Sequence, residues 1–112
     1  MDSIPHLTEV VKLMLTVQQR LANASKELFR LATAKAEAER EYRIELSKQI
    51  LILKSEGKPA TLISDIARGL TADKKFERDK ADSMFAAARD SVSALQTEAS
   101  LLKSIYERQT EV

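Results

Sequence analysis

The chain has 112 residues, which suffices for one modest core, and its 44% hydrophobic content includes only 4% aromatic residues and no Trp or Cys. The absence of Cys excludes disulfides and thiolate metal sites, and two Gly and two Pro are too few turn residues for an all-β fold. Lys and Arg number 18 against 17 Asp and Glu, so the formal charge of +1 creates no global field that would attract nucleic acid or a membrane surface.

The first half of the chain has the pattern of one long helix. No Gly or Pro interrupts residues 6–56, and a seam of almost entirely apolar positions recurs at alternating steps of three and four. The seam consists of Leu7, Val10, Met14, Val17, Leu21, Ala24, Leu28, Leu31, Lys35, Ala38 and Tyr42. This spacing predicts a helix over about residues 4–56 whose seam must be covered by a second helix. We expect Ser3 as its N-cap, Pro5 in its first turn and Gly57 as a left-handed C-cap.

Lys35 is the one charged residue on this seam. Its long side chain could extend from the edge of the seam into solvent. Alternatively, it could set the register between two helices, as single polar residues do in coiled coils. The sequence leaves both interpretations open.

After Tyr42 the apolar pattern broadens. The seam continues through Leu46, Ile50 and Leu53, while Ile44 and Leu51 open a second apolar face. Residues 60–68 have helical apolar spacing and Gly69 follows as the expected C-cap, so we predict a short helix at the tip of a hairpin. We expect this helix to pack on Ile44, Leu51 and Leu53, and Ile66 to be buried between the long helices.

A second long helix is predicted over residues 72–110. Its seam again alternates four and three, through Ala81, Phe85, Ala88, Val92, Leu95, Ala99, Leu102 and Tyr106. The predicted fold is therefore all-α, with a single domain over residues 1–112. It is a long antiparallel helical hairpin, similar to a coiled coil, with a short helix at its tip.

The unequal lengths of the two long helices predict self-association. If the second helix pairs from the tip with about residues 18–56, the apolar residues from Ile4 to Val17 remain uncovered. We therefore expect a homodimer that forms a helical bundle. Its expected interface consists of Leu7, Val10, Val11, Met14, Val17 and Leu21.

No residue pattern in the chain indicates catalysis. Glu37, Glu41 and Glu45 share a helix face, but di-iron bundles also need Glu-x-x-His, and the only histidine is His6. The serines have no nearby histidine base, and Gly57 and Gly69 are isolated rather than part of a phosphate-binding loop. We therefore predict a protein that is not an enzyme and has no metal or cofactor site.

The tip has some similarity to a helix-turn-helix. In an alignment that begins at Ser64, Ile66 and Ala67 would lie in the first helix and Gly69 in the turn. Lys74, Lys75 and Arg78 would lie on the recognition helix. Candidate contacts to nucleic acid or to a protein partner are Lys58, Arg68, Lys74, Lys75 and Arg78. Residues 54–80 contain seven basic and five acidic side chains, which is a weak electrostatic footprint for a DNA reader. A structural cap, a docking surface for a protein and a nucleic-acid contact all remain open.

Membrane association is not expected. The N-terminus lacks the basic and apolar segments of a signal peptide, and the longest strongly apolar run, residues 50–53, cannot span a bilayer. As a helix on a membrane surface, residues 1–17 would offer only Lys12 beside Asp2 and Glu9. We therefore expect a cytoplasmic protein.

Three stretches resemble a family of small helical proteins encoded by phages and prophages of Gram-positive bacteria. They are Glu-Tyr-Arg-Ile-Glu-Leu at 41–46, Glu-Gly-Lys-Pro-Ala-Thr-Leu-Ile-Ser-Asp-Ile-Ala-Arg-Gly at 56–69 and Phe-Glu-Arg-Asp-Lys-Ala-Asp at 76–82. The resemblance implies an accessory factor, encoded near replication or recombination genes and located in the host cytoplasm, without an assigned activity. The leading hypothesis is a non-catalytic interaction or scaffold protein that modulates a protein partner. The alternative is a nucleic-acid-binding accessory factor in phage DNA replication or recombination.

Overall fold

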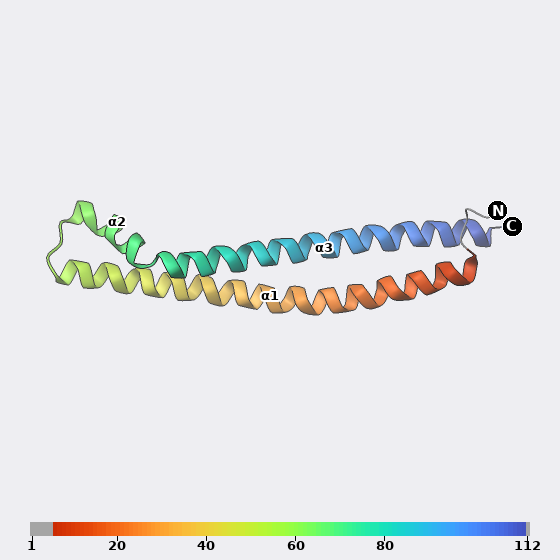
Figure 1. Ribbon diagram of the computed structural model, residues 1–112, viewed down its shortest axis with the longest axis horizontal. Coiled ribbons are helices and arrows are strands. Elements are labelled where there is room, and N and C mark those ends of the chain that lie inside the picture. Colours follow the sequence, from red (N-terminus) through yellow and green to blue (C-terminus); the bar gives the residue numbers. More distant parts are fainter. Residues whose placement is uncertain (1–5, 112) are drawn as a thin grey trace. The chain divides into compact units, whose positions relative to one another are not determined.

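A computed structural model describes residues 6–111, and within this range every regular element is an α-helix. The helices are α1 (Leu7–Ser55), α2 (Ala60–Leu70) and α3 (Ala72–Thr110). Helix α3 runs antiparallel to α1 and the short α2 lies between them in the chain, which confirms the predicted helical hairpin (Figure 1). The expected start of the first helix near residue 4, with Ser3 as its cap and Pro5 in its first turn, lies outside the described residues.

The chain divides into two compact units. The terminal unit consists of Met1–Phe29 and Ala87–Val112, and the tip unit consists of Arg30–Ala86. Each unit contains a stretch of α1 beside an antiparallel stretch of α3, and the tip unit also contains all of α2. The organisation as a single domain stays a prediction.

Helix α1 ends in a Schellman motif. Gly57 has a φ of 75°, which a residue without a side chain adopts at little cost. The backbone N–H of Lys58 donates to the carbonyl of Leu53 at 3.1 Å, and the N–H of Gly57 donates to the carbonyl of Lys54 at 3.1 Å. Pro59 follows directly as the N-cap of α2. The predicted left-handed cap at Gly57 is therefore confirmed.

The core of the tip unit lies between α1 and α2. Ile63 and Ala67 of α2 are buried against Leu53 of α1, and Leu46 and Ile50 pack around them. The predicted contact of α2 with Leu53 is thus confirmed. The predicted contacts with Ile44 and Leu51 are wrong, because these two side chains are 55% and 66% exposed. Leu46, Ile50 and Leu53 share one face of α1, which places Ile44 and Leu51 on the opposite face.

Ile66 does not lie in this core. Its side chain is 36% exposed, so the prediction that it is buried between the long helices is wrong. The physical reason is the four-residue spacing of Ile63, Ala67 and Thr71, which places these three buried residues in one row along the chain. Ile66 belongs to the neighbouring row, at the edge of the contact.

Thr71 joins α2 to α3. It is buried, and its hydroxyl donates a hydrogen bond of 2.8 Å to the carbonyl of Ala67. Its own carbonyl accepts a hydrogen bond of 3.0 Å from the N–H of Lys75 in the first turn of α3. Thr71 is the only residue between the two helices, since α2 ends at Leu70 and α3 begins at Ala72. Gly69 therefore lies inside α2. The prediction that Gly69 is the C-cap is therefore wrong.

In the terminal unit, α3 accompanies α1 to its first turn. Val10 and Val17 are 0% and 2% exposed, and Leu95 of α3 is also buried. Arg20 of α1 forms an ion pair of 3.5 Å with Glu98 of α3. From Glu98, α3 continues to Thr110, which is about as many residues as α1 has between Leu7 and Arg20. Helix α3 is therefore long enough to reach the first turn of α1. The premise of an uncovered segment is therefore wrong.

The predicted pairing of the two long helices is wrong because it places the start of α3 beside the last turns of α1. In the tip unit, Lys74 of α3 lies 3.5 Å from Glu41, so α3 begins several turns before the end of α1 at Ser55. The last turns of α1 are covered by α2 instead. This shift leaves the full length of α3 for the remainder of α1.

Replacing Ile63 with Ala tests this arrangement of the tip. Ile63→Ala removes a buried side chain from the contact between α1 and α2, so we expect it to lower the free energy of unfolding by about 2–5 kcal/mol. Ile66→Ala is the matched control, because it makes the same chemical change one row away, and we expect it to cost clearly less. Urea denaturation followed by circular dichroism measures both. A larger loss for Ile66→Ala would contradict the orientation of α2.

Candidate functional site

A contact across the tip unit begins at Lys35. Its Nζ lies 2.9 Å from Oδ1 of Asp82, and it also lies 5.0 Å from the centroid of the Phe85 ring. Both partners are on α3, three residues apart and therefore on the same helix face. Lys35 thus reaches from the edge of the seam and, at the same time, contacts the opposite helix at a defined position.

Arg78 makes the reciprocal contact from α3. Its guanidinium carbon lies 4.5 Å from the centroid of the Tyr42 ring, and its Nε lies 3.6 Å from Oε2 of Glu39. Arg78 also donates hydrogen bonds of 3.2 Å and 3.0 Å to Asp79, and these raise the pKa of its guanidinium above the ordinary value. Arg78 is therefore permanently charged and engaged within its own chain.

The other predicted basic contacts at the tip are partly engaged as well. Lys74 pairs with Glu41 at 3.5 Å, and Arg68 pairs with Asp65 at 3.5 Å on the same helix. Lys58 and Lys75 make no ion pair among residues 6–111. Three of the five candidate residues thus have an acidic neighbour, and the helix-turn-helix alignment loses its turn because Gly69 lies within α2.

The predicted oligomer interface separates into covered and exposed residues. Val10 and Val17 are buried within the terminal unit, and Met14 and Leu21 are partly buried. Leu7 and Val11 remain exposed, and with exposed Leu15 they form a row at four-residue spacing on α1. A dimer could use this row without opening the helix pair, whereas Val10 and Val17 are not available to it.

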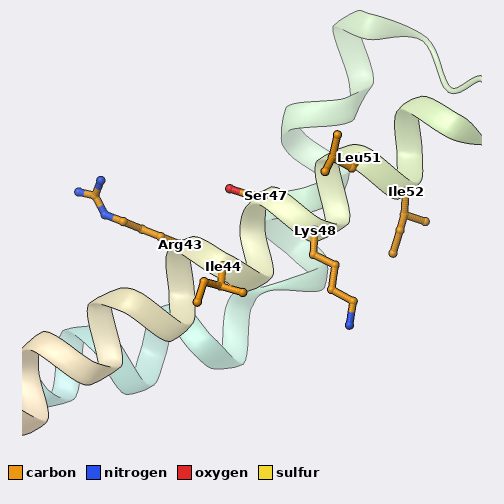
Figure 2. Close-up of a pocket in the computed structure, with 6 residues that line it drawn as sticks. All are labelled: Arg43, Ile44, Ser47, Lys48, Leu51 and Ile52. Carbon is orange, nitrogen blue, oxygen red and sulfur yellow. The ribbon is translucent and has the colours of Figure 1, made fainter.

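The most distinctive surface of the tip unit is an exposed strip on α1. It is a shallow apolar pocket lined by six residues of this one helix: Arg43, Ile44, Ser47, Lys48, Leu51 and Ile52. Ile44, Leu51 and Ile52 are 55%, 66% and 37% exposed. Figure 2 shows that Ile44, Lys48 and Ile52 project on the same side of the helix. We call these six residues the α1 strip.

Basic residues accompany the α1 strip along two helical rows. One row contains Arg40, Ile44, Lys48 and Ile52, and the neighbouring row contains Arg43, Ser47, Leu51 and Lys54. Between Arg40 and Lys54 these rows contain no acidic residue, and Glu39 and Glu56 lie one turn beyond their ends. Arg43 pairs with Glu39 at 2.7 Å, whereas Arg40, Lys48 and Lys54 make no ion pair within the described part of the chain.

The sequence pattern indicates part of this strip. It predicts Ile44 and Leu51 as a second apolar face, but it assigns the short helix to cover them. It does not single out Ile52 or the accompanying cations. The four-residue spacing from Arg40 through Ile44 and Lys48 to Ile52 was the available signal.

Metal-ligand clusters and membrane-spanning helices are both absent from the part of the chain that the structure describes. Residues 6–111 contain no group of three or more His, Asp or Glu side chains that could hold a metal ion. Glu37 and Glu45 are separated from Glu41 by one turn each, and Glu41 pairs with Lys74. None of the described helices has a stretch long and apolar enough to cross a lipid bilayer.

No family model, no curated protein and no solved structure matches this chain.

Proposed function

We propose that this chain is a non-catalytic interaction protein that binds a protein partner along the α1 strip. The observation that carries the proposal is the exposure of Ile44, Leu51 and Ile52 on a regular helix, on the face opposite to the core. Three aliphatic side chains in one pocket can stabilise a complex when a partner removes them from water. The resemblance of residues 41–46, 56–69 and 76–82 to small phage proteins suggests a bacterial host cytoplasm as the setting.

The proposal includes self-association through the terminal unit. Leu7, Val11 and Leu15 form an exposed apolar row, and a second copy could cover it by antiparallel packing of α1 on α1. This contact is separate from the α1 strip, because the two surfaces belong to different units.

Nucleic-acid binding is the competing function, and a mobility-shift assay separates it from the proposal. A basic surface that binds phosphate loses affinity steeply as salt rises. The ion pairs of Arg68, Lys74 and Arg78 with acidic neighbours make the tip a weak candidate for such a surface.

A single substitution in the strip tests partner binding. We expect Leu51→Glu to abolish capture of the specific partner from a bacterial lysate, because it places a charge among the aliphatic contacts. Leu101→Glu is the matched control: both residues are leucines on long helices, with exposures of 66% and 62%. Quantitative mass spectrometry of captured proteins is the readout. Equal capture by both variants and the wild type would remove the strip as the binding site.

A double substitution tests self-association. Val11→Glu with Leu15→Glu places like charges on the exposed row, so we expect light scattering to report a change from dimer to monomer. Because both side chains are exposed, the melting temperature at low protein concentration should change little. A wild type that is monomeric at micromolar concentration would contradict the dimer.

A further inference from the structure

The cations in and beside the α1 strip indicate the chemistry of its partner. Arg40, Lys48 and Lys54 are exposed and make no ion pair among the residues that the structure describes. They lie on the same two rows as Ile44, Leu51 and Ile52, and the acidic residues of these rows, Glu39 and Glu56, lie only beyond the ends of this segment. A ligand of this face therefore meets aliphatic side chains and unpaired positive charge together.

We propose that the strip binds an acidic amphipathic helix of a partner protein. This inference rests on the proposed function and specifies its ligand. A helix with aliphatic residues at a spacing of three and four would pack on Ile44, Leu51 and Ile52, as helices do in a coiled coil. Glu or Asp residues flanking that aliphatic seam would lie beside Arg40, Lys48 and Lys54.

A second copy of this chain fits the strip less well. A two-fold interface brings the same surface together twice, so it would place two sets of unpaired cations beside each other. The like charges would oppose association, and the acidic residues of these rows, Glu39 and Glu56, lie only at their ends.

A lipid surface also fits less well. A helix that lies on a membrane separates its basic face from a continuous apolar face that contains Trp, Phe or Leu. Here Arg40 and Lys48 alternate with Ile44 and Ile52 along one row, and no aromatic residue lines the pocket. Insertion of the aliphatic side chains would carry the cations between them into the apolar layer.

Two fluorescein-labelled synthetic peptides test the inference by fluorescence anisotropy. Both are 18 residues long and have Leu at alternating three- and four-residue steps, and they differ in having Glu or Gln at every flanking position. At low salt we expect the full chain to bind the Glu peptide about tenfold more tightly than the Gln peptide. The difference should shrink as salt rises, because exposed charges are screened.

Two double variants with equal changes in net charge locate the contact. Arg40→Glu with Lys48→Glu should weaken binding of the Glu peptide about tenfold and change binding of the Gln peptide little. Lys12→Glu with Lys26→Glu is the control, because these exposed lysines of the terminal unit also make no ion pair in the described chain. This control variant should bind the Glu peptide like the wild type. Circular dichroism confirms that each variant is folded.

The outcomes distinguish the inference from the proposed function. Equal affinity for both peptides, abolished by Leu51→Glu, would overturn the acidic helix and retain the strip as a protein-binding site. If Leu51→Glu does not change binding of the Glu peptide, both the inference and the proposed function are overturned. Failure of both peptides to bind overturns the inference. The inference is also overturned if the chain binds phosphatidylglycerol vesicles instead of the peptides and this binding depends on Leu51 and Lys48.

Discussion

Two reciprocal contacts set the register of the long helices in the tip unit. Lys35 of α1 reaches Asp82 and Phe85 of α3, and Arg78 of α3 reaches Glu39 and Tyr42 of α1. In both helices the cation is followed by a carboxylate after four residues and by an aromatic ring after seven. The same short pattern thus occurs in each helix, and antiparallel packing places each cation beside the other helix's acid and ring.

The energy of this arrangement comes from several modest terms. An exposed ion pair contributes about 0.2–1 kcal/mol, and a cation above an aromatic ring at an exposed site contributes about 0.5–1 kcal/mol. These terms are small beside apolar burial, but they depend on position, whereas a seam rich in Ala and Leu tolerates sliding by one heptad. The reciprocal contacts therefore contribute specificity of register more than stability. That register places the start of α3 beside Glu41 and leaves the last turns of α1 to α2.

The division of α1 between its two neighbours also defines its free surface. Helix α2 covers the face of α1 that contains Leu46, Ile50 and Leu53. The opposite face, with Ile44 and Leu51, then has no neighbour within the described chain and remains exposed. The α1 strip is thus a consequence of how the hairpin closes, and a partner that binds it would not need to open the core.

Much of the fold follows from periodicity, whereas register and exposure do not. The seam spacing, the uninterrupted stretch over residues 6–56 and Gly57 with Pro59 predicted three helices and the turn between α1 and α2. The spacing could not show whether α2 or α3 covers the end of α1, because an Ala- and Leu-rich seam fits either neighbour. The pairing of Ile63 rather than Ile66 with Leu53 depends on the rotation of a short helix about its own axis. Two adjacent apolar rows of similar composition leave that rotation undetermined in the sequence.

The central claim is the register of α3 on α1, and cross-linking of introduced cysteines measures it directly, since the natural chain has no Cys. A variant with Glu41→Cys and Lys74→Cys joins the two positions that form an ion pair across the helices. A variant with Lys54→Cys and Lys74→Cys joins the positions that would be opposite if α3 paired from the end of α1. The two α1 positions are separated by about 20 Å along the helix, at about 1.5 Å per residue. We expect a short bis-maleimide to link residues 41 and 74 within one chain and to leave 54 and 74 unlinked, and efficient linkage of 54 to 74 would contradict the account.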